Sequence, residues 1–129
     1  MRNRVMRNRY AAIALLAAEL LCGCGPASRG NAATLTDGNP DRGISAIAHY
    51  GCGSCHFIPG ISGAHGLVGP PLSGIKDRIY VAGSLHNNSA NLRRWIQGPH
   101  EVNQQTAMPD LGVTAQDAND IVAYLYSLR

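Results

Sequence analysis

Lysine, long apolar runs and alternating strand patterns are scarce in this chain, and each scarcity excludes a class of protein. Lys76 is the only lysine, and the formal net charge of +3 lies entirely before Cys24. From Cys24 onward, seven basic residues meet seven acidic ones, so the chain lacks the concentrated basic face that nucleic-acid binding requires. No segment alternates apolar and polar residues convincingly, so we expect no strand.

The first residues have the composition of an export signal. Four arginines precede an apolar stretch at residues 10–18, and further leucines lead to small residues and cysteine. The apolar stretch is too short to span a bilayer, and Glu19 interrupts it near its end. We therefore predict that residues 1–23 are a signal peptide and that the mature protein lies on the periplasmic side of a bacterial membrane.

The end of this segment, Leu21-Cys22-Gly23-Cys24, resembles the cleavage motif of bacterial lipoproteins. Leucine stands at −3 and a small residue at −1, and Cys24 would be lipidated after cleavage. The alternative is an ordinary secretory signal cut somewhat later, near Ala33. We favour lipidation of Cys24, because the two leader cysteines are spaced too tightly for a disulfide and have no other evident use.

The rest of the 129-residue chain has room for one small domain behind a linker. Residues 24–39 consist mostly of small and polar residues with almost no apolar bulk, which is typical of a flexible tether. Residues 40–129 form the predicted domain. A domain of roughly 90 residues buries only a modest core by itself.

Helical periodicity marks three segments of this domain. Asp41 precedes apolar residues at helical spacing, which predicts a short first helix. A second helix is predicted at residues 89–97, where apolar residues share one face and Gly98 ends the pattern. Thr114 is the predicted N-cap of the last helix, which carries a clear apolar stripe. Residues 57–72 are rich in glycine and proline and predict a loop, so the expected fold class is all-α.

The run from Cys52 to His56 is a C-x-x-C-H motif. Its two thiols, on Cys52 and Cys55, can add to the vinyl groups of haem, while the adjacent histidine ligates the iron from one face. A structural zinc half-site would need a second Cys/His pair, and a thioredoxin-like site would need a βαβ setting. Neither context is present, so we predict one covalent haem c whose iron is bound by His56.

The second axial ligand decides what such a haem can do. Met108 is the only methionine after the leader, and Pro109 disfavours helix at that point, which suits a loop folded against a haem face. Met108 could instead fill a gap in the core. His100 is the strongest rival and would give bis-histidine iron of lower potential. The other histidines are expected at the surface: His49, His65 and His86. We predict Met108 as the ligand.

At this point the chain resembles the class I, mitochondrial-type cytochrome c family over residues 41–129. The motifs that carry the resemblance are Cys52 to His56, Gly69-Pro70-Pro71-Leu72 with Arg78, Leu92 to Pro99, and Met108-Pro109 followed by the Asp120 to Leu125 helix. The resemblance implies a small cytochrome c fold, with short helices wrapped around one covalently attached haem.

The resemblance also implies roles for residues around the haem. The carbonyl of Pro70 would accept a hydrogen bond from the ring N–H of His56, which fixes the ring and raises its basicity. Arg78 would approach a haem propionate, the alternative being a surface ion pair with Asp77 or another carboxylate. Three residues of the second predicted helix would line the haem pocket, or simply pack in the core: Leu92, Trp95 and Ile96.

These observations together predict a one-electron carrier and not an enzyme. With both axial positions filled, no site remains for a small-molecule substrate. The carrier would take electrons from a quinol-oxidising complex or a periplasmic dehydrogenase and pass them to a terminal oxidase. The lysine-rich docking face of the family is missing, so a lipid anchor and tether would replace electrostatic steering by raising local concentration.

Two alternative functions stay open at this stage. The chain could be a dedicated cytochrome subunit of a dehydrogenase or oxidase complex. It could also be a haem enzyme or gas sensor, in which Met108 is unbound and an open iron meets peroxide, oxygen or nitric oxide. Distal catalysis would need a polar group over the iron, for which only His100 is available.

Overall fold

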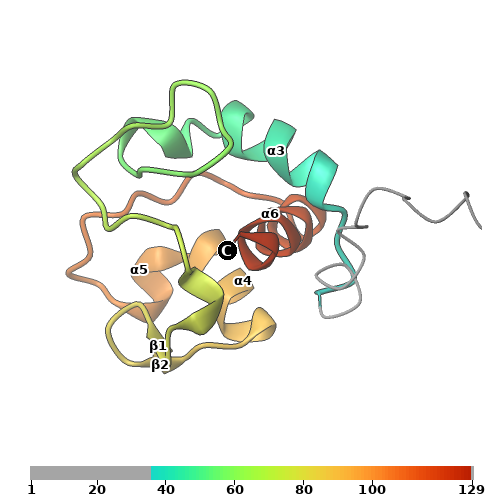
Figure 1. Ribbon diagram of the computed structural model, residues 1–129. Coiled ribbons are helices and arrows are strands. Elements are labelled where there is room, and N and C mark those ends of the chain that lie inside the picture. Colours follow the sequence, from blue (N-terminus) through green and yellow to red (C-terminus); the bar gives the residue numbers. More distant parts are fainter. Residues whose placement is uncertain (1–35, 129) are drawn as a thin grey trace, which may run out of the picture.

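The computed structural model describes residues 36–128. The predicted signal peptide, the lipidation site Cys24 and residues 24–35 of the predicted tether lie outside this range. The elements are α3 (Pro40–His49), η2 (Cys52–Ser54), η3 (Ile75–Asp77), β1 (Tyr80–Val81), β2 (Leu85–His86), α4 (Ser89–Gln97), α5 (Pro99–Val102) and α6 (Ala115–Ser127) (Figure 1). No helix in the described range is long and apolar enough to cross a membrane.

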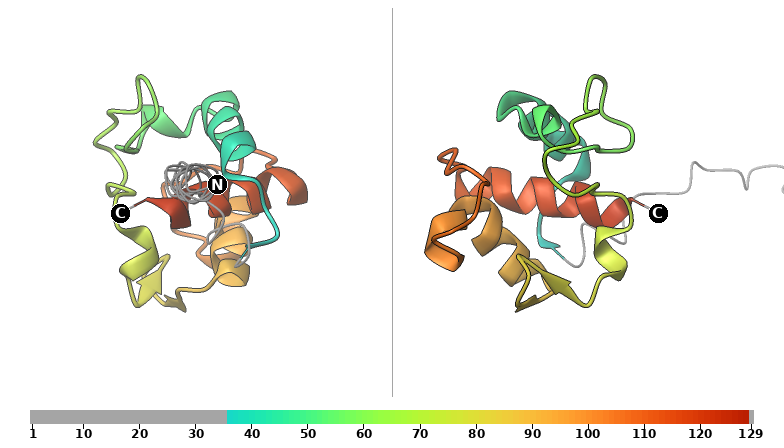
Figure 2. Two further views of the ribbon diagram at one scale, coloured as in Figure 1. Left: turned by 45° about the vertical axis from the view of Figure 1, so that its right-hand side comes forward. Right: turned by 90° about the vertical axis from the view of Figure 1, so that its left-hand side faces the viewer.

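Helix α6 is the central element of the fold. Figure 2 shows it lying lengthwise with α3 on one side and α4 on the other, and it contacts both. The hydroxyl of Thr114 accepts a hydrogen bond from the N–H of Asp117 at 3.1 Å, so the predicted N-cap is confirmed. The buried apolar residues of α6 are Ala118, Ile121, Val122, Ala123, Tyr124 and Leu125. This stripe forms the middle of the core.

Asparagine side chains cap the starts of α3 and α4. The side-chain oxygen of Asn39 accepts from the N–H groups of Asp41 and Arg42 at 2.9 and 3.0 Å. The side-chain oxygen of Asn88 accepts from the N–H of Asn91 at 2.8 Å. Helix α4 has the predicted bounds, but a short helix, α5, which was not predicted, begins directly after Gly98.

The expectation that the domain contains no strand is wrong. Strands β1 and β2 pair antiparallel, with Tyr80 opposite His86. Ala82 and Gly83 between them have φ angles of 52° and 81°, which a tight turn requires. Each strand has only two residues, which is too short for an alternating pattern to show in the sequence. The fold is therefore mostly helical with one small two-stranded sheet.

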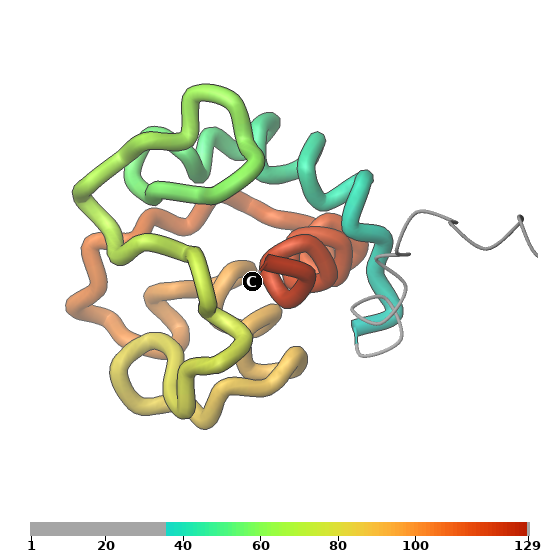
Figure 3. The backbone as a smooth tube through the Cα atoms, in the orientation of Figure 1, coloured from blue at the N-terminus to red at the C-terminus, as the bar shows by residue number. Residues whose placement is uncertain are grey.

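The loop predicted at residues 57–72 is present and crosses the upper left of Figure 3. Although irregular, it is tied firmly to the domain. Ile58 is 1% exposed, and the hydroxyl of Tyr124 donates a hydrogen bond to the carbonyl of Pro59 at 2.6 Å. The N–H of Gly69 donates to the carbonyl of Cys55 at 2.8 Å. The loop therefore lies over the cysteine motif in a defined position.

The last residues of the predicted tether are packed against the domain. Thr36 is buried, and the N–H of Asn39 donates to the carboxylate of Asp120 at 2.6 Å. A side chain at Gly38 would collide with the backbone carbonyl of Asn119. Residues 36–39 therefore belong to the packed part of the chain, and only residues before them can act as a tether.

A buried carboxylate joins α3 to α6. Asp120 is 1% exposed and accepts hydrogen bonds from Arg42 Nε and Nη2 at 2.7 and 2.9 Å. Gln116 and the N–H of Asn39 donate to the same carboxylate. Burial raises the pKa of Asp120, but the hydrogen bonds and the charge of Arg42 outweigh it, so the pKa is lowered from the usual 3.8.

We expect Asp120→Asn to lower the free energy of unfolding at pH 7 by about 2 kcal/mol, the scale of hydrogen bonds to a charged group. Because the pKa is lower in the folded state, this stabilisation is complete above the unfolded-state pKa and is lost as the pH falls through the folded-state value. Urea unfolding at pH 7 and at acid pH measures it. The control is Asp37→Asn, which changes an exposed carboxylate. If the difference in unfolding free energy between wild type and Asp120→Asn does not shrink at acid pH, the ionised carboxylate of Asp120 is not the source of the stabilisation.

Candidate functional site

One cavity of about 460 Å³ lies in the middle of the domain. Its walls come from α3, α4, α6, the 57–72 loop and the segment between α5 and α6. It is lined by every residue that the sequence assigns to the haem: Cys52, Cys55, His56, Pro70, Arg78, Leu92, Trp95, Ile96 and Met108. Residues up to 56 positions apart in the sequence are thus brought to one site by the fold.

The cysteine motif forms the turn that follows α3. Gly51, with a φ of 69°, adopts a left-handed conformation and turns the chain away from the axis of α3. The N–H of His56 donates to the carbonyl of Cys52 at 3.0 Å. Cys52 and Cys55 are half-buried and free, and both line the cavity. Burial raises the pKa of the Cys52 thiol. The turn therefore presents two thiols to the same cavity.

The ring of His56 is held by a backbone carbonyl. Its Nδ1 lies 2.7 Å from the carbonyl oxygen of Pro70. Because a carbonyl only accepts hydrogen bonds, Nδ1 carries the proton and the lone pair of Nε2 is left for a metal. A side chain at Gly69 would collide with the His56 ring, so glycine is required beside it. The hydrogen bond that the family resemblance implies is present.

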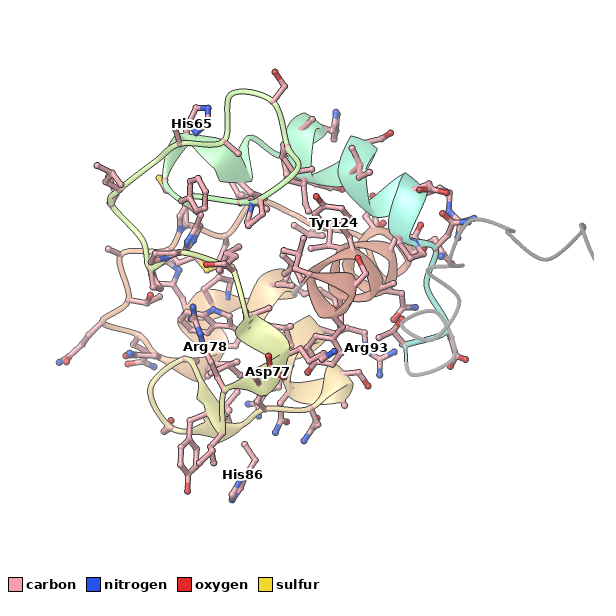
Figure 4. All side chains as sticks on the ribbon, in the orientation of Figure 1. His65, Asp77, Arg78, His86, Arg93 and Tyr124 are labelled. Carbon is pink, nitrogen blue, oxygen red and sulfur yellow. The ribbon has the colours of Figure 1, made fainter. Side chains whose placement is uncertain are left out.

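Arg78 reaches the cavity from the end of η3 (Figure 4). Its Nη2 donates to the carbonyl of Pro71, and no ion pair with Asp77 is present in the described structure. The side-chain amide of Asn87 donates to the carbonyl of Arg78 at 2.9 Å, and the hydroxyl of Tyr126 donates to that amide's oxygen at 2.8 Å. Asn87 was not anticipated from the sequence, because no local pattern shows this contact.

Met108 lies in the irregular segment between α5 and α6. It is half-buried and lines the same cavity as His56. Its N–H donates to the hydroxyl of Thr106 at 3.1 Å. A soft thioether sulfur is therefore available at the cavity wall as a second ligand.

None of the other four histidines lines the cavity. His65 and His86 lie at opposite outer edges of the molecule (Figure 4). His49 is exposed, and the Nδ1 of His100 lies 3.1 Å from a carboxylate oxygen of Asp110. The strongest rival ligand is thus engaged outside the cavity.

Much of the apolar wall was not anticipated from the sequence. Its further members come from loops, η3 and the small sheet: Ile58, Leu72, Ile75, Val81, Leu111 and Val113. These segments are too short or irregular to show a hydrophobic period. The only sequence signal was that each residue is apolar within a glycine-rich or polar setting.

The residues present fit a covalent haem. Two thiols lie on one turn, and the imidazole of His56 has a free Nε2. A thioether, a guanidinium and an apolar enclosure complete the set, which matches the ligands and surroundings that haem requires. When bound, haem supplies one-electron redox chemistry at its iron.

Comparison with known proteins agrees with this geometry. The sequence model of the cytochrome c family, described as "Cytochrome c", matches residues 41–129. Cytochrome c oxidase subunit 2 of Alkalihalophilus pseudofirmus is 31% identical over 90 residues, covering 69% of this chain and 25% of the relative. The subunit of the same name from a Bacillus species is 28% identical over 88 residues, covering 65% and 25%.

The chain spans about a quarter of the length of these relatives. No solved structure matches it. The family match nevertheless covers nearly all of the domain, including the cysteine motif and Met108. The chain therefore belongs to the cytochrome c family and carries a covalently bound haem c with its iron.

Proposed function

We propose that this protein is an exported, lipid-anchored monohaem cytochrome c of the class I type that carries one electron at a time. The observation that carries the proposal is that Cys52, Cys55, His56 and Met108 line one cavity. The iron would be bound by His56 and Met108. Short helices would wrap around the haem, and residues 40–129 would form the cytochrome domain behind the signal peptide (1–23) and the tether (24–39), whose last residues, 36–39, pack against the domain.

The wall residues named above would contribute to this function in different ways. The thiols of Cys52 and Cys55 hold the haem through thioethers, and the carbonyl of Pro70 fixes the ring of His56. Apolar side chains such as Leu92 exclude water from the iron. Arg78 offers its guanidinium to a propionate. A thioether ligand in an apolar setting favours Fe(II), so a relatively high potential is expected.

The proposed partners are redox proteins of the membrane or periplasm. Electrons would enter from a quinol-oxidising complex or a periplasmic dehydrogenase and leave to a terminal oxidase. The names of the two relatives, cytochrome c oxidase subunit 2, support the oxidase side of this path. With both axial positions filled, the protein would not be an enzyme by itself.

The same relatives favour a second candidate, a fixed cytochrome subunit of an oxidase or dehydrogenase complex. Solubilising membranes in mild detergent and separating native complexes distinguishes the two. A free carrier migrates alone, whereas a fixed subunit migrates with the complex. An open-iron enzyme or gas sensor has less support, since His100, its distal candidate, does not line the cavity.

The ferric near-infrared spectrum tests the ligand proposal directly. A charge-transfer band in the near infrared arises when methionine sulfur binds ferric haem iron. We expect this band in the holoprotein. Its absence, together with carbon-monoxide binding by the reduced protein, would overturn the carrier in favour of an open-iron protein.

The anchor can be tested through Cys24. Several acyl chains hold a lipoprotein firmly, whereas one chain binds only marginally. We therefore expect wild-type protein to stay with membranes through high-salt washing and Cys24→Ser protein to be released or to remain as a precursor. The matched control is Cys22→Ser, which keeps the cysteine at the cleavage site. Mass spectrometry that finds a soluble native chain beginning after Cys24 would exclude lipidation without touching the haem assignment.

A further inference from the structure

The segment that carries Met108 has few ties to the rest of the domain. Residues 103–114 connect α5 to α6 and contain no helix or strand. Some of their hydrogen bonds close turns inside the segment, such as the N–H of Thr106 to the carbonyl of Asn103 at 3.1 Å. The bond from the N–H of Met108 to the hydroxyl of Thr106 is also internal. These bonds shape the segment but do not fix it over the cavity.

One side chain in the middle of the segment does reach another element. The Oδ2 atom of Asp110 lies 3.1 Å from Nδ1 of His100. The Oδ1 atom lies 3.4 Å from the backbone N of His100. An ionised carboxylate only accepts hydrogen bonds, so Nδ1 of His100 carries a proton and donates it. Within residues 36–128, these are the only hydrogen bonds that join residues 104–112 to another element.

The position of this contact relates it to the proposed ligand. Asp110 follows Met108 by two residues, and His100 follows Pro99, which is buried at the start of α5. The contact therefore ties the far side of Met108 to a helix that is itself fixed in the core. Elsewhere the segment is anchored near its ends, by the N–H of Asn103 on the carbonyl of Pro99, by buried Val113, and by the N–H of Thr114 on the hydroxyl of Tyr50 at 3.4 Å.

We propose that His100 and Asp110 form a clamp that holds the Met108 segment closed over the cavity. Both are positioning residues: neither touches the cavity, and they act on the iron through Met108. The inference rests on the proposed function, in which Met108 is the axial ligand. It also gives His100, the rival ligand from the sequence, a role outside the cavity.

The clamp predicts how readily an external ligand displaces Met108. Imidazole added to the ferric holoprotein binds only when the thioether leaves the iron, so its affinity reports opening of the segment. Asp110→Ala removes both hydrogen bonds and should raise imidazole affinity about three- to tenfold, the scale of a lost exposed hydrogen bond. Amide hydrogen exchange of residues 104–112 should accelerate by a similar factor.

Two further variants separate the clamp from general effects. His100→Phe keeps a ring but removes the Nδ1 donor, while the backbone N–H of residue 100 can still donate to Asp110. It should therefore raise imidazole affinity by the same factor as Asp110→Ala or by somewhat less. The double variant should show little more than Asp110→Ala alone, because removing the carboxylate already abolishes both hydrogen bonds. Glu101→Ala is the matched control. It removes a carboxylate of α5, the helix that carries His100, and this carboxylate makes no hydrogen bond to the segment, so the variant should behave as wild type.

The outcomes distinguish the clamp from the function on which it rests. If Met108→Ala opens the iron to imidazole but Asp110→Ala and His100→Phe bind imidazole as wild type does, the clamp is excluded and the ligand stands. If Met108→Ala leaves the ferric spectrum and imidazole binding unchanged, the proposed ligand itself is excluded. Equal effects of Glu101→Ala and Asp110→Ala would show a loss of surface charge in place of a clamp.

Discussion

Replacing Met108 with alanine is expected to create a carbon-monoxide site on the reduced protein. The substitution removes the only sulfur outside the cysteine motif from the cavity wall, so the iron would lose its second protein ligand. Because the lost thioether favours Fe(II), the reduction potential of the haem should fall by on the order of 0.1 V, which is a fraction of the range over which axial ligands tune haem. Optical titration with carbon monoxide and redox potentiometry measure both effects.

The comparison variant for this experiment is His100→Ala. Since His100 does not line the cavity, this variant should keep the near-infrared band of methionine ligation and should loosen Met108 without removing it. The opposite result would be an unchanged Met108→Ala protein and a His100→Ala protein that binds carbon monoxide. That result would identify His100 as the second ligand and the haem iron as bis-histidine.

Replacing Cys52 and Cys55 together with serine is expected to abolish covalent attachment of the haem. A serine hydroxyl does not form a thioether with a vinyl group, so acid acetone should extract the haem from the double variant and leave it on the wild type. Each single variant should retain one thioether, which shifts the absorption of the pyridine complex. The effect is complete because no other cysteine of the described residues is available.

The matched control changes a cysteine outside the motif. Cys22→Ser lies in the predicted leader and should leave the haem on the mature protein. The covalent assignment would be contradicted by wild-type protein whose haem is already extractable. Both readouts depend on bonds to the haem and not on activity, so they remain informative if the variants are poor electron carriers.

Local signals in the sequence were sufficient for three helices. The cap at Thr114, with its partner Asp117 three residues later, places the start of α6, and the apolar stripe after it places the buried face. Helix α4 has the bounds that its periodicity predicts. These features depend on neighbours within one or two turns, which is why the sequence reveals them.

Non-local contacts account for what was missed. Strands β1 and β2 have two residues each, and α5 has four, so neither shows a period. The packing of residues 36–39 depends on Asp120, which is 81 positions away from Asn39 in the sequence. A segment of small polar residues predicts a tether unless its distant partner is known.

The site divides in the same way. Cys52, Cys55 and His56 were evident from the sequence, because the chemistry of attachment requires them within one short motif. That the Pro70 carbonyl holds the ring of His56 was implied by resemblance and is seen as a 2.7 Å contact. The sequence could not reveal the hydrogen bond from the side chain of Asn87 to the carbonyl of Arg78, because that contact depends on how the end of η3 meets the residues before α4.

By itself, then, the sequence determined the cofactor motif, the main helices and the candidate ligand Met108, since each depends on residue type and short spacing. Only the tertiary structure decided between Met108 and His100 as residues of the cavity wall. Both histidine and methionine can ligate iron, and both lie in the same stretch of chain. Which one faces the cavity depends on the turn from α5 into the segment and on the carboxylate of Asp110, which binds the histidine elsewhere.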